Sequence, residues 1–194
     1  SADIPDSALT LTQDRAALRT HKKDRQYFEQ DVVWDSDLGP GEWQCVNLLN
    51  SLIGPGVKSL VDIGSGAGRL LNNLTYSGLR VAVDASETAV RQVQGQRAVC
   101  SVTDLPFADG AFEVSLCSNV LEHLDDADLE KAIREIDRGT RKTAIIVSPI
   151  DEDLGGQSIL CSNCGGHFHP NGHKRRFGVG DFEALLTRFR TTLV

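Results

Sequence analysis

From about residue 57 onward, short apolar runs alternate with longer amphipathic segments. The runs have strand length, and we expect strands at residues 59–63, 80–83, 98–102, 112–117 and 143–148. Between them, apolar residues recur at three- and four-residue spacing, which predicts helices at about residues 68–77, 87–94 and 127–138. Buried parallel strands joined by crossover helices produce this alternation. The pattern therefore predicts an α/β fold: a doubly wound, mostly parallel sheet with helices on both faces.

The chain ends show helical periodicity. We expect helices at about residues 12–30, 42–53 and 181–188, and a short β-like tail at 191–194. The predicted domains are a helical arm or lid over residues 1–56 and an α/β domain over residues 57–194, with an insert at about 151–177 that shows neither period. The arm carries Tyr27, Phe28 and Trp34, which either cover a ligand cleft or pin the arm to the core.

The net charge and the hydropathy of the chain argue against some classes of function. The formal net charge of -7 argues against broad nucleic-acid binding, because neutralising phosphates requires clustered Lys and Arg. One short basic run, Lys174 to Arg176, indicates a solvated loop. The apolar runs fall far short of the ~20 residues of a bilayer span, and the chain begins without the features of a secretory signal. We expect a cytoplasmic protein with no membrane partner.

A glycine-rich turn follows the first predicted strand, in the segment Asp62-Ile63-Gly64-Ser65-Gly66-Ala67-Gly68. Glycines allow a tight turn and a close approach of a ligand to backbone amides at a helix N-terminus. Asp84 ends the next strand, where a carboxylate can accept both hydroxyls of a ribose, although it could instead cap the following helix. These features indicate a Rossmann-like nucleotide site, with a spacing unlike the Gly-x-Gly-x-x-Gly of dinucleotide enzymes.

At these residues the chain resembles the class I methyltransferases that depend on S-adenosylmethionine (SAM), and in particular the small-molecule enzymes with Asp-x-Gly-x-Gly-x-Gly in the first turn. Asp62, Gly64, Gly66 and Gly68 match that motif in place. The resemblance continues through residues 102–114 and 118–124 and covers residues 58 to about 150.

The resemblance implies a set of cofactor contacts. Gly64 to Gly66 should lie along the methionine part of SAM, with Asp62 beneath them, and Asp84 should hold the ribose. Asp104 should approach the adenine amino group. The full implied set is Asp62, Gly64, Ser65, Gly66, Gly68, Asp84, Ala85, Thr103, Asp104, Leu105, Ser118 and Asn119, of which the last two should face the transferred methyl group.

His123 is the candidate catalytic base, since a hydroxyl or a protonated amine acceptor must lose a proton. The alternative is structural, because Glu122-His123 can cap a helix and hold loop backbone. Relatives that methylate catechols bind a divalent metal with Glu-x-x-Glu-His, but here Asn119 replaces the first glutamate.

The insert contains a Cys-x2-Cys-x4-His-x3-His pattern. Cys161, Cys164, His169 and His173 form a complete tetrahedral set for a structural Zn²⁺ ion, and the neighbouring glycines let a short loop wrap around it. His167 could replace His169, but a similar recurring insert in bacterial methyltransferases favours His169 and His173. The alternative is a pair of ordinary thiols beside surface histidines.

The sequence favours a SAM-dependent methyltransferase that transfers a methyl group in line to a small-molecule acceptor. The alternatives are an RNA or protein methyltransferase whose insert docks the substrate, and an inactive SAM-binding regulator. Relatives usually carry a seventh, antiparallel strand, and this chain stops at about the sixth. We therefore expect a sheet truncated at its C-terminal strands or completed by a partner, and leave a homo-oligomer open.

Overall fold

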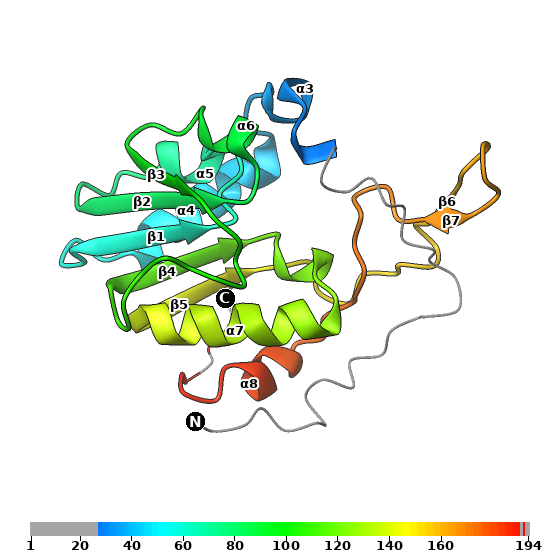
Figure 1. The fold of residues 1–194 in the computed structure, drawn as a ribbon. Coiled ribbons are helices and arrows are strands. Elements are labelled where there is room, and N and C mark those ends of the chain that lie inside the picture. Colours follow the sequence, from blue (N-terminus) through cyan, green and yellow to red (C-terminus); the bar gives the residue numbers. More distant parts are fainter. Residues whose placement is uncertain (1–26, 191, 193–194) are drawn as a thin grey trace.

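A computed structural model describes residues 27–190 and residue 192 (Figure 1). Its centre is a five-stranded sheet in the order β3-β2-β1-β4-β5, in which every pairing is parallel. The strands are β1 (Ser59–Ile63), β2 (Leu79–Asp84), β3 (Gln96–Val99), β4 (Phe112–Ser118) and β5 (Thr140–Val147). The order reverses between β1 and β4, so the carboxyl ends of these strands border the switch point where ligands bind in such folds.

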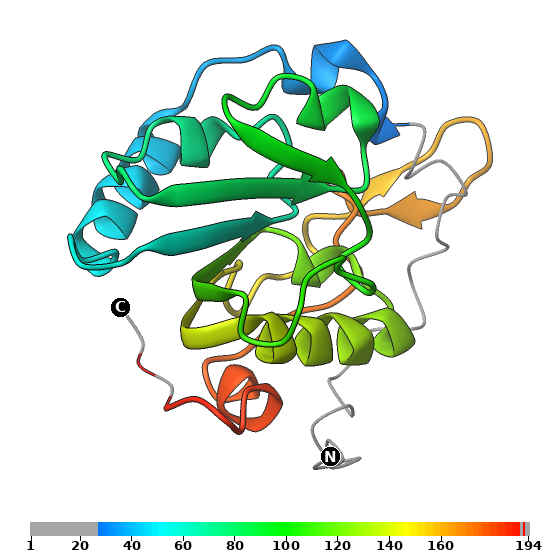
Figure 2. The ribbon, with the colours of Figure 1, turned by 60° about the vertical axis from the view of Figure 1, so that its left-hand side comes forward.

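Helices cover both faces of the sheet, with α7 and α8 on one side and α4 on the other (Figure 1, Figure 2). The helices are α3 (Asp31–Trp34), α4 (Pro40–Leu52), α5 (Arg69–Asn72), α6 (Glu87–Val90), α7 (Asp126–Gly139) and α8 (Asp181–Leu185), with a 3-10 turn η1 (Leu121–His123) after β4. The predicted fold class, a Rossmann-like doubly wound sheet, is confirmed.

Alternate side chains of the central strand feed two separate cores. Val61 and Ile63 point into the core that contains α7 and α8, while Leu60 points into the core that contains α4 and α5. All five residues of β1 are buried, which is why three of them, Leu60, Val61 and Ile63, are apolar; Ser59 and Asp62 are its buried polar residues.

Four predicted elements are shorter than expected, among them α8, which ends at Leu185 rather than residue 188. Strand β3 ends at Val99 rather than residue 102, because Val99 lies opposite Asp84, where its partner strand β2 ends. Helix α5 has only four residues, and the following chain is held by Asn50, which accepts from the backbone N–H of Thr75. Helix α6 also has four residues, and Gly95 with φ +109° turns the chain into β3.

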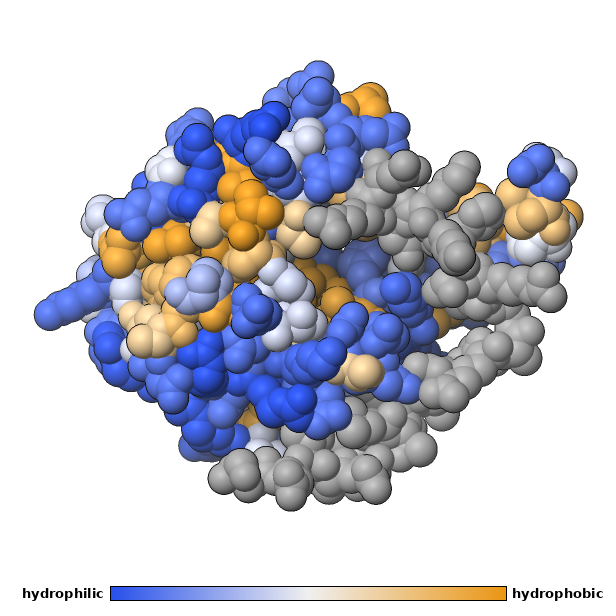
Figure 3. All heavy atoms as spheres, viewed as in Figure 1, coloured by the Kyte–Doolittle hydropathy of each residue, from blue (hydrophilic) through white to orange (hydrophobic). Residues whose placement is uncertain are grey.

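The insert contains a small hairpin where no strand was expected. Strands β6 (Ile159–Leu160) and β7 (His167–Phe168) pair antiparallel and project from the body of the molecule (Figure 1). The side chains of β6 are largely exposed, and apolar atoms are visible on the projecting hairpin (Figure 3).

Parts of the N-terminal and C-terminal predictions cannot be compared. The helix expected at 12–30 and the tail expected at 191–194 lie almost wholly outside the described residues. Among the helices that are described, none has the length and apolar character needed to cross a membrane.

The central packing of α7 generates a stability prediction. Ile136 is fully buried between α7 and the sheet, so Ile136→Ala should lower the free energy of unfolding by about 2–5 kcal/mol. Arg134→Ala on the exposed face of the same helix removes only a surface ion pair with Glu130 and should cost no more than about 0.5 kcal/mol. Urea unfolding followed by circular dichroism measures both. Equal losses would contradict the assignment of the buried face.

Candidate functional site

The glycine turn is attached to the end of β2 by its backbone. Gly64 and Ser65 both donate their N–H groups to the carbonyl oxygen of Val83, at 2.8 and 3.0 Å. Gly64 and Gly66 have φ values of +72° and +54°, a region that glycine adopts without steric cost. A side chain would also collide here, since a Cβ on Gly64 would lie 2.2 Å from Val120 Cγ2. Glycine is therefore required at these positions both for the positive φ and because a side chain would not fit.

A cavity of about 440 Å³ opens at the carboxyl ends of β1, β2 and β4. Its volume lies in the range of small-molecule and cofactor sites. Seven residues of the predicted cofactor set line it: Gly64, Ser65, Gly66, Asp84, Ala85, Ser118 and Asn119. The five that do not line it are Asp62, Gly68, Thr103, Asp104 and Leu105. The structure thus brings the glycine turn, the end of β2 and the end of β4 to one cavity.

Asp84 holds the glycine turn and the start of α6 together. Its Oδ2 accepts from Gly66 N–H and its Oδ1 from Ser86 N–H, both at 2.8 Å. A carboxylate offers about four lone-pair sites, so acceptor capacity remains for two ribose hydroxyls. The helix cap is instead Ser86, whose Oγ accepts from Ala89 N–H at 3.1 Å. Ser86, and not Asp84, is therefore the residue that caps α6.

Asp62 lies under the glycine turn rather than in the cavity wall. It is 2% exposed on β1. Burial, and secondarily the negative charge of Asp84, raise the pKa of this carboxyl to about 7. Burial also raises the pKa of Asp84, against the lowering effect of its backbone hydrogen bonds. A positive charge bound in the cavity would favour ionised Asp62.

The wall on the side of β3 differs from the expected adenine contacts. Cys100, Ser101 and Val102 line the cavity there. Leu105 is instead buried in the core beside α7, and its N–H donates to Glu135 at 2.8 Å. Asp104 is exposed. Strand β3 ends earlier than expected, at Val99. Residues 100–102, which directly follow it, therefore lie at the wall in place of residues 103–105.

Two aromatic residues of the N-terminal arm line the cavity. Trp34 Nε1–H donates to the carbonyl oxygen of Phe28 at 2.8 Å, and the same oxygen accepts from Ser86 Oγ at 2.7 Å. The Trp34 ring covers Gly66, where a Cβ would come within 2.5 Å of it. Phe28 and Trp34 therefore lie against the glycine turn and α6, whereas Tyr27 is 53% exposed and does not line the cavity.

The opposite wall carries the candidate acceptor side. Ser118 and Asn119 end β4 there, and Asn119 has a left-handed backbone (φ +54°), which asparagine tolerates better than most residues. His123 lines the same cavity from η1. Its Nδ1 lies 3.3 Å from Gly172 O, and its ring meets Phe28 edge to face at 5.9 Å. His123 thus joins three segments: the arm, η1 and the insert.

The end of the insert is clamped onto η1. Lys174 N–H donates to Glu122 O at 2.8 Å, and Arg175 donates twice to Leu124 O, at 3.1 and 2.7 Å. Arg175 is 1% exposed and also pairs with Asp126. The expectation of a solvated basic run is therefore wrong at Arg175, whose guanidinium is buried because it satisfies a loop carbonyl and a carboxylate.

The predicted zinc ligands fall into two groups. Cys161 and Cys164 lie at the projecting hairpin, half-buried and exposed respectively. His169 and His173 lie nearer the body, at 3% and 8% exposure, with stacked rings 4.6 Å apart. In the described part of the chain, the sets of three mutually close ligand groups are Glu122 with His123 and His173, and Glu152 with His169 and His173. Neither set contains a cysteine.

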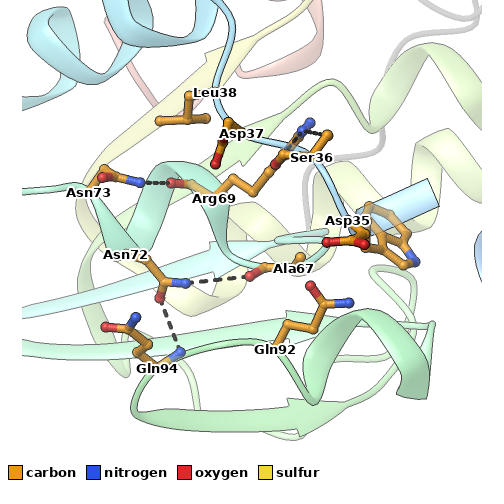
Figure 4. Close-up of a pocket in the computed structure, with 11 residues that line it drawn as sticks. Asp35, Ser36, Asp37, Leu38, Ala67, Arg69, Asn72, Asn73, Gln92 and Gln94 are labelled. Carbon is orange, nitrogen blue, oxygen red and sulfur yellow. Dashed lines mark hydrogen bonds between the residues drawn. The ribbon is translucent and has the colours of Figure 1, made fainter. Parts of the chain in front are cut away.

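A second hollow of about 470 Å³ adjoins the first and shares Trp34, Ala67 and Arg69 with it. Figure 4 shows that Asn72 joins two parts of its wall: its side-chain amide donates to Ala67 O and accepts from Gln94 N–H. These bonds tie α5 to the glycine turn and to the chain that precedes β3.

Sequence reasoning missed several wall residues. Glu42 and Arg69 line the cavity and form an ion pair at 2.8 Å, joining α4 to α5. Glu152, beside the two histidines, was also missed. The sequence did offer a signal for Glu152, because it lies in the acidic run after the fifth strand. The carboxyl ends of parallel strands meet at one edge of the sheet, so a residue at this place lies near that edge.

The glycine turn, the acidic end of β2 and the open cavity at the switch point define a Rossmann-like cofactor-binding domain. Solved structures show the same fold. PH0226 from Pyrococcus horikoshii OT3 is 15% identical, with a TM-score of 0.60 over 86% of this chain and 90% of that one. A SAM-dependent methyltransferase from Archaeoglobus fulgidus is 21% identical, with a TM-score of 0.56 over 76% of this chain and 67% of that one.

The sequence comparisons show which family this part of the chain resembles. Residues 61–148, a little under half of the chain, match the sequence model of a family described as a methyltransferase domain. A protein of Mycobacterium sp. (strain KMS), described as an uncharacterized methyltransferase, is 37% identical over 78 residues. That match spans 37% of this chain and 31% of the relative's length. Residues 61–148 are therefore similar to a methyltransferase domain, and their fold is one that solved SAM-dependent methyltransferases share.

The raised pKa of Asp62 generates a pH prediction. The buried carboxyl stays protonated up to about pH 7 while the unfolded one ionises near 3.8, so its contribution to stability is present at low pH and is lost as the pH rises through about 7. Relative to Asp62→Asn, the unliganded protein should lose up to about 1.4 kcal/mol of unfolding free energy per pH unit between about pH 5 and pH 7, with no further change above about pH 8. Chemical unfolding of both proteins across this range measures the difference, and a pH-independent difference would rule out the raised pKa.

Proposed function

We propose that this protein is a SAM-dependent methyltransferase that transfers the methyl group in line to a small-molecule acceptor. The observation that carries the proposal is the meeting of Gly64 to Gly66, Asp84 and Asn119 at one cavity of about 440 Å³, within the residues that match a methyltransferase family. A sulfonium is already an activated methyl donor. The protein's main task is then to align donor and acceptor and to exclude water.

SAM would bind with its methionine part along the glycine turn and its ribose at Asp84. The ligand is cationic at its sulfonium and amino groups, which suits a cavity that Asp84 lines and that has Asp62 buried beneath its glycine turn. Phe28 and Trp34 would serve as the lid over the bound cofactor, since both already line the cavity from the arm.

His123 is proposed as the base that takes a proton from the acceptor, or as a group that positions it. It lines the wall that also carries Ser118 and Asn119, where the transferred methyl is expected. If Nδ1–H donates to Gly172 O, the Nε2 atom keeps its lone pair as the proton acceptor.

The remaining parts of the proposal concern partners and metal. The acidic balance of the whole chain favours a small molecule over RNA, and a protein acceptor, an inactive SAM-binding regulator and a homo-oligomer stay as alternatives. A cytoplasmic location also stays a prediction. The structural Zn²⁺ set expected from the sequence is Cys161, Cys164, His169 and His173, and it competes for the same two histidines with a set that contains Glu152.

Cofactor binding tests the first step. Titration calorimetry should show saturable binding of SAM and S-adenosylhomocysteine but not NAD. Asp84→Asn should weaken SAM binding by about 10- to 150-fold, the value of a hydrogen bond to a charged group. Asp109→Asn is the matched control, because that carboxylate is exposed and pairs with Arg138 away from the cavity. Unchanged affinity in Asp84→Asn would remove it from the site.

Methyl transfer tests the second step. Methyl-labelled SAM is incubated with the protein and with separated metabolite, RNA and protein fractions of an extract, and label is expected in the metabolite fraction. His123→Gln should leave SAM affinity within about 3-fold and lower transfer on the order of 10²- to 10⁴-fold if it is the base. Label in RNA or protein would overturn the acceptor class. SAM binding without transfer to any fraction would favour the regulator.

A further inference from the structure

A cluster of buried histidine and glutamate side chains lies between the insert and the rim of the cavity. Its central members are Glu152, which follows β5, and His169 and His173, which follow the hairpin. His173 Nδ1 lies 2.6 Å from Glu152 Oε2, and His169 Nε2 lies 3.5 Å from Glu152 Oε1. Two imidazoles and one carboxylate make a common ligand set for zinc and for other divalent transition metals.

The spacing of these groups fits one ion. Ligands at about 2 Å from a tetrahedral metal are separated from one another by roughly 3.3 Å. The two distances to the Glu152 carboxylate bracket this value, and one ligand atom from each of the three residues lies within 4.8 Å of the others. Small side-chain adjustments would therefore bring three ligands around a common centre.

Buried polar atoms without hydrogen-bond partners lie beside this cluster. The His169 side chain is 1% exposed, yet its Nδ1 has no hydrogen-bond partner in the described structure. Glu122 Oε1 is also buried without a partner, and Glu122 belongs to the adjoining set with His123 and His173. Neither is a ligand atom of the Glu152 set, in which His169 offers Nε2. They show that the polar groups around the cluster are incompletely satisfied, which costs about 1–3 kcal/mol each.

The charge balance points the same way. Glu152 is 10% exposed, and in the described part of the chain it pairs with the two histidines and with no lysine or arginine. The two nearby guanidinium groups are used elsewhere, Arg175 on Asp126 and Arg176 on Asp151. A buried carboxylate requires a positive partner, and a metal ion would supply it.

We propose that Glu152, His169 and His173 bind one divalent transition-metal ion, of the zinc type, at the rim of the cavity. This set replaces Cys161 and Cys164 by a carboxylate and leaves a coordination position open, as in three-ligand zinc sites. The ion lies behind His123, whose ring centroid is 4.9 Å from that of His173. The proposal concerns metal binding and holds whether or not methyl transfer occurs.

Metal titration of matched variants tests the proposal. The full chain is stripped with a chelator, checked for folding by circular dichroism, and titrated with ZnCl₂ against a coloured competitor. Glu152→Gln keeps the shape and some hydrogen bonds of the carboxylate but loses its charge, and its zinc affinity should fall by more than about 10-fold. Asp153→Asn, the neighbouring acid, and the double variant Cys161→Ser/Cys164→Ser should each still bind one ion per chain with unchanged affinity.

Cobalt absorption gives a second readout that needs no variant. Co²⁺ bound by nitrogen and oxygen ligands should show visible ligand-field bands without the strong near-ultraviolet charge-transfer band of a thiolate. A thiolate band, or loss of zinc in the cysteine variant, would overturn the proposed set. If the folded wild type binds no zinc, the three residues form only a hydrogen-bonded cluster and the proposal is wrong. Calorimetry with SAM on the same samples reports separately on the cofactor site.

Discussion

Three backbone amides of the glycine turn, from Gly64 to Gly66, are bound to the end of β2, two by Val83 O and one by Asp84. The cofactor cavity depends on these bonds. They fix the turn at the carboxyl edge of the sheet, where its glycines leave room for a ligand and for the Trp34 ring. They also use part of Asp84, so one carboxylate both builds the turn and faces the cavity. Loss of this connection would separate the two halves of the cavity.

The sheet and the glycine turn could be predicted because their signals are local. A fully buried strand such as Ser59–Ile63 is a short, mostly apolar run, and the left-handed positions at Gly64, Gly66 and Gly68 tolerate little but glycine. The same holds for the ends of β2 and β4, where Asp84 and Ser118 are the last strand residues, Asn119 follows directly, and all three reach the cavity. For these residues, the position along the strand is enough to predict that they lie at the carboxyl edge of the sheet.

The rest depends on contacts between distant segments, which periodicity does not record. Arg175 lies in a basic run that indicates a solvated loop, yet it is buried because Leu124 O and Asp126 lie opposite it. The spacing of Cys161, Cys164, His169 and His173 suggests one set, whereas the close sets in the described residues join the two histidines to Glu122, His123 or Glu152, which lie far from them in the sequence. The lengths of α5 and α6 were overestimated for a related reason: side chains such as Asn50 hold the chain that leaves a helix, and amphipathic spacing does not reveal this.

The order of the strands has a consequence for how the protein is made. Strand β1 lies in the middle of the sheet and pairs on one side with β2, which is close in sequence, and on the other with β4, which is synthesised much later. Pairings between distant segments form slowly, because the chain must first close a long loop. During synthesis the glycine turn and Asp84 can therefore assemble while the wall made by Ser118 and Asn119 is still missing. Until β4 docks, the backbone N–H and C=O groups along one edge of β1 stay unpaired, and such an open edge can pair with another chain.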